Sequence, residues 1–157
     1  RVHDEYMDEY GVVHREIMEL CGQSLSRGPI VLSWEAIQEE TMAPGSHDLV
    51  IHECAHKLDL LNGAANGFPP LHPGMNARVW ARDFHQAYQR FCAELDSRGN
   101  PRFDPYAAED SAEFFAVLSE TFFTAPRLIR EDAPAVYDHL QAFYRQDPDR
   151  VLRRIKP

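Results

Sequence analysis

The sequence predicts an α+β domain, with short strands first and a helical half after them. Two observations carry this prediction. The first third of the chain holds two β-branched runs separated by glycine-containing turns, and apolar residues recur at helical spacing from about residue 48 onward. The chain has 157 residues, 44% of them hydrophobic, which is enough to close one core. We therefore expect a single domain over residues 1–157.

The predicted strands are Gly11–Met18 and Pro29–Trp34, and the turns between them contain Gly22 and Ser26–Gly28. Two strands alone cannot hold a sheet together. Either helices cover these strands, or their partner strands lie in a preceding part of the protein. Arg1 stands where an initiator methionine is expected, which favours a missing N-terminal segment.

The second part of the chain predicts helices bounded by recognisable end signals. Gly63 and Gly99 follow the first two apolar patterns, as is typical of helix C-termini. Pro126 and Pro134 suit the first turns of two later helices. The predicted helices are Asp48–Leu61, Met75–Asp96, Asp110–Phe123, one beginning near Pro126 and one running from Pro134 to about Tyr144.

Charge and composition exclude several classes of protein. Twenty-five acidic residues against 16 Lys and Arg leave a net charge of −9, whereas direct nucleic-acid binding needs a basic surface. No apolar run approaches the roughly 18 residues of a membrane-spanning helix. Cys21, Cys54 and Cys92 are odd in number and scattered, which indicates reduced thiols in a cytoplasmic protein.

The first predicted helix contains an H-E-x-x-H motif made by His52, Glu53 and His56. Residues four apart differ by about 40° around a helix, so both imidazoles project from one face. That arrangement lets two neutral nitrogens hold one zinc ion. Glu53 is then placed to take a proton from the attacking water as general base. The alternative is a surface helix with two incidental histidines.

A zinc site of this kind needs a third ligand. One large group of metal proteases continues the motif as H-x-x-G-x-x-H, but Asp59 and Asn62 stand at those positions and exclude that group. The best alternative is Glu113, because it opens a later helix whose apolar side would pack against the core. Asp110-x-x-Glu113 also fits a helix capping box. Glu120, two turns further along the same side, is either the alternative ligand or a residue that supports one.

Asp59 falls on the same helix face, seven residues after His52 and three after His56. Its carboxylate could accept the second N–H of a ligand histidine and fix its tautomer. The alternative is a solvated aspartate near a helix end. The helix dipole disfavours negative charge at a C-terminus, which favours a specific partner for Asp59.

Several blocks of this sequence together resemble the Mlc titration factor A family of zinc peptidases. The likeness extends from about Gly11 to Asp147. The family belongs to the gluzincins and is related here to the catalytic domain of anthrax lethal factor, which implies a zincin-like metallopeptidase fold. The blocks are Gly28–Trp34, His52–Asp59, Asn62-Gly63, Gly67–Pro70, Asp104–Ala108 and Ala112–Glu120.

The resemblance implies a role for each matching residue. His52, His56 and Glu113 match the ligands of one Zn²⁺ per chain, and Glu53 matches the general base. Tyr106 matches a tyrosine that points at the metal in the lethal-factor-like relatives, where its phenol could donate to the developing oxyanion. The alternative for Tyr106 is a partly buried loop tyrosine. Family members carry a further segment before the first strand, so we expect this chain to lack it.

Two functions of different classes follow. The first is a zinc metallopeptidase that hydrolyses peptide substrates with aminopeptidase-like activity. The second is a regulatory binding protein, because family members sequester the transcriptional repressor Mlc and an acidic surface could suit a basic DNA-binding protein. A third interpretation is a metal-free structural relic. A peptide substrate could pair with an exposed edge of either predicted strand.

Overall fold

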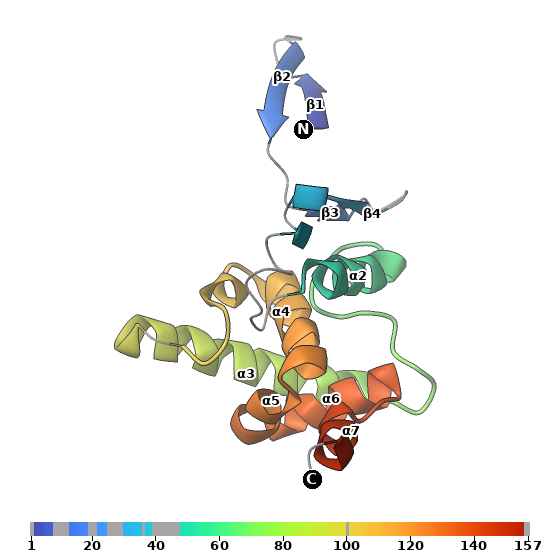
Figure 1. The fold of residues 1–157 in the computed structure, drawn as a ribbon, viewed down its shortest axis with the longest axis vertical. Coiled ribbons are helices and arrows are strands. Elements are labelled where there is room, and N and C mark those ends of the chain that lie inside the picture. The colour runs from blue at the N-terminus through green and yellow to red at the C-terminus, as the bar shows by residue number, and fades with distance from the viewer. Residues whose placement is uncertain are drawn as a thin grey trace.

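Helices make up most of the part of the chain that the structure describes (Figure 1). The structure is a computed structural model that describes residues 2–7, 13–18, 22–24, 30–35, 37–38, 48–99 and 101–155. The helices are α2 (Leu49–Asp59), α3 (Ala77–Arg98), α4 (Ser111–Thr124), α5 (Pro126–Asp132), α6 (Pro134–Tyr144) and α7 (Pro148–Ile155), with the 3-10 helices η1 (Leu60–Asn62) and η2 (Pro105–Ala108). The strands are β1 (Val2–Met7), β2 (Val13–Met18), β3 (Gly22–Ser24) and β4 (Ile30–Leu32). No described helix is long and apolar enough to cross a membrane.

The predicted α+β class, with N-terminal strands forming part of a zincin-like domain, is wrong. The strands form two separate antiparallel pairs, β1 with β2 and β3 with β4, and the second pair lies beside α2. A pair of strands buries too little apolar surface to act as a layer of a core. Among the side chains that the structure describes, every buried hydrophobic one lies at Ala55 or later. The domain is therefore mainly helical. Some features used in the sequence analysis lie outside the described residues, namely Arg1, Cys21 and the turn Ser26–Gly28.

Helix α4 is the centre of the core. Ten of its 14 residues are buried, which explains why it is apolar nearly all the way round. Phe115 and Phe122 are fully buried, and they contact rings from the helices around α4. On α3, Trp80 stacks on Phe84 with ring centroids 4.3 Å apart. The mutual packing of aromatic side chains therefore takes the place of a sheet.

Capping residues mark ends of α2 and α3 close to the predicted positions. The Asp48 carboxylate accepts a hydrogen bond from the Ile51 amide at 3.0 Å and so begins α2. Asn76 caps α3 in the same way, so that helix begins two residues after the predicted Met75. Gly99, with φ of +63°, ends α3 in the left-handed conformation. Helix α7 was not predicted, because it has only eight residues and half of them are charged.

Candidate metal centre

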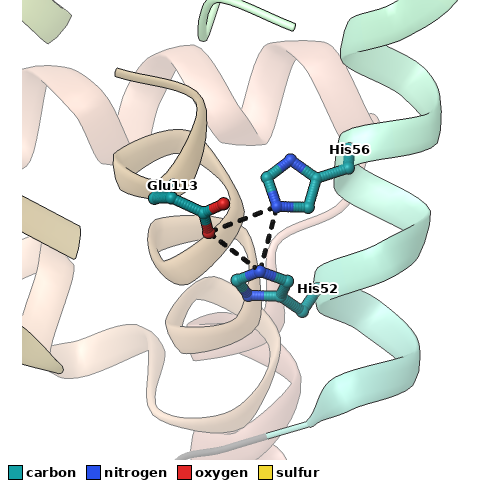
Figure 2. Close-up of side chains that lie close together, drawn as sticks. All are labelled: His52, His56 and Glu113. Atoms are coloured by element: carbon teal, nitrogen blue, oxygen red, sulfur yellow. Dashed lines mark hydrogen bonds and ion pairs between the residues drawn. The ribbon is translucent and has the colours of Figure 1, made fainter. Parts of the chain in front are cut away.

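His52, His56 and Glu113 meet between α2 and α4, which lie side by side. Figure 2 shows both imidazoles of α2 facing the carboxylate of α4. Oε2 of Glu113 is 3.1 Å from Nε2 of His52 and 3.3 Å from Nε2 of His56, and the two nitrogens are 3.0 Å apart. Ligand atoms arranged tetrahedrally about 2.0–2.2 Å from a zinc ion lie about 3.3–3.6 Å from one another. The triangle of atoms therefore fits a small divalent metal with little adjustment.

The charges at this triangle favour a cation. Burial opposes the charged form of Glu113, but hydrogen bonds from His52 and His56 outweigh burial and lower its pKa to about 2. Burial likewise opposes protonation of His52, but Glu113 and Glu120 outweigh it and raise the pKa of His52 to about 9. Glu113 and Glu120 thus favour positive charge at His52, which is the charge that a divalent metal ion would bring to this triangle.

Glu113 uses its side chain for the histidines and not for capping. The cap of α4 is the Asp110 carboxylate, which accepts from the amides of Ala112 and Glu113 at 2.7 and 2.9 Å. A reciprocal capping box would direct the Glu113 carboxylate back to the Asp110 amide. The observed carboxylate instead faces His52 and His56 (Figure 2).

Glu120 lies behind His52. One of its carboxylate oxygens accepts a hydrogen bond from Nδ1 of His52, the ring nitrogen that faces away from Glu113. The other accepts from the Asp48 amide at 3.1 Å. The side chain is 4% exposed and does not belong to the group of atoms that could share one metal ion. Its position is that of a support for His52.

Glu53 is 6% exposed and follows His52 directly in α2. Burial raises its pKa, and the positive charges of His56 and His52 only partly oppose that effect. A buried carboxylate with a raised pKa beside two imidazoles has the chemical properties of a proton acceptor.

Tyr106 in η2 reaches the same region. Its ring centroid is 6.2 Å from that of His52, and the residue is 51% exposed. Partial burial raises the pKa of its phenol, and the negative charge of Glu113 raises it further. The hydroxyl therefore keeps its proton near neutral pH and can act as a donor.

Asp59 is fully buried at the end of α2, but its contacts differ from the predicted one. Oδ2 accepts hydrogen bonds from the amides of Asn66 and Gly67, both at 2.7 Å, whereas Oδ1 has no partner among the described residues. Burial raises the pKa of Asp59, and the amide hydrogen bonds oppose this effect. Asp59 therefore holds the loop after α2, and it makes no hydrogen bond to any histidine ring that the structure describes. The contacts of Asn66 and Gly67 were not predicted, since no local pattern marks them.

Comparisons with known proteins show which family this chain resembles. A model of the family described as glucose-regulated metallo-peptidase M90 matches residues 1–145. The chain is similar to the protein named Mlc titration factor A from Serratia proteamaculans, with 44% identity over 99% of this chain and 60% of the relative. It is also similar to the protein of that name from Yersinia enterocolitica, with 46% identity over 98% of this chain and 58% of the relative.

The matched region covers nearly all of this chain but only part of each relative. The chain spans about 60% of the length of the curated relatives that it matches. The resemblance to the Mlc titration factor A family, which the sequence blocks indicated, is confirmed. The chain belongs to the glucose-regulated metallo-peptidase M90 family.

Proposed function

We propose that this chain is a zinc-dependent peptidase that hydrolyses peptide bonds. The observation that carries the proposal is the triangle of three side-chain atoms 3.0–3.3 Å apart, with the buried Glu53 next to His52 in the sequence. A closed structural zinc site takes four protein ligands, whereas three leave a position for catalysis. The three candidate ligands found among the described residues therefore favour a catalytic site.

Each residue then has a distinct task. His52, His56 and Glu113 would hold one Zn²⁺ per chain. Bound there, Zn²⁺ supplies Lewis acidity and brings the pKa of a water toward neutrality. Glu53 accepts a proton from the attacking water as it adds to the scissile carbonyl, then delivers that proton to the leaving amine. Glu120 supports this chemistry by orienting the His52 ring.

Other residues would position the substrate. The Tyr106 phenol would donate a hydrogen bond to the oxyanion that develops on the scissile carbonyl. The predicted strand Pro29–Trp34 contains β4, which pairs with β3 beside α2. An extended peptide that paired with β4 would therefore lie near the site. The resemblance to the Mlc titration factor A family favours cleavage at the amino end of the peptide.

The Glu53→Gln variant tests the proposal. We expect the purified protein to retain one zinc ion per chain while hydrolysis of a peptide library falls by about 10²-fold or more, because only the proton acceptor is lost. Glu131→Gln, which alters an exposed acid on α5, is the matched control and should leave hydrolysis unchanged. A wild-type protein that holds one zinc ion but cleaves no peptide would contradict the peptidase proposal.

Metal analysis tests the site itself. Zinc should disappear from a variant carrying both His52→Ala and His56→Ala, because two of the three ligands are lost. Wild-type protein that takes up no zinc would instead favour a metal-free relic. We expect about one zinc per chain in the wild type and none in the double variant.

Binding to a transcriptional repressor is the second candidate function. The relatives carry the name Mlc titration factor A, and the net charge of −9 would complement a basic DNA-binding protein. We expect purified Mlc to bind the wild type and Glu53→Gln equally, because the buried Glu53 contributes little to the surface. Both functions suit the cytoplasm, where the free thiols of Cys54 and Cys92 would stay reduced.

A further inference from the structure

The spacing between α2 and α4 decides whether the metal site can form. Two of its three facing side chains come from α2 and the third from α4. Metal–ligand distances vary by only about 0.2 Å in well-formed sites. A shift of one helix against the other by much more than this would separate Glu113 from His52 and His56.

On the α2 side, the backbone of Gly67 is tied to Asp59. Asp59 follows His56 by three residues on the same helix and is fully buried. Its Oδ2 atom accepts the amide N–H groups of Asn66 and Gly67 at 2.7 Å. These two bonds fix the position of Gly67 relative to the helix that carries both histidines.

On the α4 side, Gly67 lies directly against the first residue of the helix. A Cβ atom added to Gly67 would come within 2.3 Å of the carbonyl oxygen of Ser111, which is closer than real Cβ atoms approach. Ser111 begins α4 two residues before Glu113. The Gly67 carbonyl also accepts a hydrogen bond from Nε1 of Trp80 on α3, at 3.3 Å. Gly67 is thus enclosed on three sides by the helices it touches.

We propose that Gly67, anchored by Asp59, is a positioning residue that sets the distance from Glu113 to the two histidines. This inference rests on the proposed metal site and adds to it a determinant of metal affinity outside the ligand set. Gly67 is a glycine for two reasons, its positive φ of +74° and the close approach of Ser111. Only the second reason connects it to the metal site.

The Gly67→Ala variant, compared with Gly74→Ala, separates these reasons. Gly74 has a φ of +94°, but a Cβ atom there would meet nothing within 4 Å. Both variants therefore strain the backbone of the same loop, and only Gly67→Ala displaces Ser111. We expect the zinc dissociation constant, measured by chelator competition, to rise about tenfold or more in Gly67→Ala and to change less than about threefold in Gly74→Ala. Thermal unfolding of the metal-free proteins reports whether both variants fold.

A second pair of variants tests the anchor if Gly67→Ala does not fold. Asp59→Ala removes the acceptor of the two amides, whereas Asp59→Asn keeps one oxygen for them. We expect zinc affinity to fall about tenfold in Asp59→Ala and to be largely restored in Asp59→Asn. Equal zinc affinity in Gly67→Ala and Gly74→Ala, or in Asp59→Ala and the wild type, would overturn the inference while leaving the proposed function intact. Absence of zinc binding by the wild type would overturn both.

Discussion

Glu120 and His52 are joined by a hydrogen bond from Nδ1 of the imidazole to the buried carboxylate. The second oxygen of Glu120 accepts from the Asp48 amide, at the first turn of α2. One side chain of α4 therefore fixes both the start of α2 and the orientation of a ring on it. Because Nδ1 donates its proton to Glu120, the lone pair of a neutral His52 lies on Nε2, which faces His56 and Glu113.

Under the proposed function, removing this hydrogen bond should weaken zinc binding while all three proposed ligands remain in place. We predict that Glu120→Ala raises the zinc dissociation constant about 10–100-fold, the range typical of residues that orient a ligand histidine. Glu120→Gln should show a smaller loss, since its amide oxygen can still accept from Nδ1. Chelator competition on the purified variants measures both constants.

The control for Glu120 is its buried neighbour on α4, Ser119. The Ser119 hydroxyl donates to the Phe115 carbonyl and accepts from the Tyr144 hydroxyl, and it does not contact the metal site. Ser119→Ala should lower stability slightly and leave zinc affinity unchanged. Equal zinc affinities for Glu120→Ala and Ser119→Ala would show that Glu120 only contributes to packing.

Tyr106 should affect catalysis and not metal binding. Its ring lies 6.2 Å from that of His52, so the phenol can reach a substrate carbonyl at the site. Under the proposed function, Tyr106→Phe should lower kcat by about 10²–10³-fold with little change in KM or zinc content, because the hydroxyl acts in the transition state. In the control Tyr137→Phe, the lost hydroxyl bonds to Asp147, so stability and not kcat should change. An unchanged kcat in Tyr106→Phe would show that the Tyr106 hydroxyl has no role in catalysis.

Local sequence patterns predicted which side chains meet between α2 and α4, but they did not predict the fold class. The spacing of His52 and His56 is sufficient to predict that their rings face one point, because helix geometry is local. Glu113 was proposed because it opens a predicted apolar helix, and its carboxylate does lie against both histidines. The contact between Gly67 and Ser111 joins residues 44 positions apart, and no local pattern indicates it.

The fold class was wrong for a related reason. Gly11–Met18 has the β-branched composition of a strand, and β2 lies within that run. Composition does not determine how many strands pair, and here each strand has one described partner. The class depends instead on aromatic packing among helices, in which Trp80 and Phe115 take part over a long sequence separation.

The helical core predicts that the same Leu→Ala substitution lowers the free energy of unfolding much more on α4 than in η1. Leu118 on α4 is fully buried, whereas Leu61 in η1 is 66% exposed. Leu118→Ala should lower the free energy of unfolding by roughly 2–5 kcal/mol, because it leaves a cavity among packed rings. Leu61→Ala should change it by less than about 0.5 kcal/mol. Urea unfolding of the metal-free proteins measures both, and similar losses in the two variants would contradict the placement of α4 at the core.

Asp149 in α7 should make stability depend on pH under acidic conditions. Its carboxylate is fully buried, and it accepts from Arg153 and from Arg130, the latter at 2.9 Å. The hydrogen bond from Arg153 outweighs burial and lowers the pKa of Asp149 below its ordinary value of 3.8. A lowered folded-state pKa means that the stabilisation is present above pH 3.8 and is lost as the pH falls through the folded-state pKa.

We therefore expect Asp149→Asn to be less stable than the wild type by roughly 1–3 kcal/mol at pH 7, because charge-assisted hydrogen bonds to arginine are lost. The difference should shrink as the pH falls below 3.8, where the wild-type carboxylate also becomes neutral. Glu131→Gln is the control, because its 61% exposed side chain pairs with Arg102 only at the surface and should cost less than about 1 kcal/mol. Thermal unfolding between pH 3 and 7 measures the difference. A gap between the wild type and Asp149→Asn that stays constant with pH would show that Asp149 stabilises α7 by its shape and not by its charge.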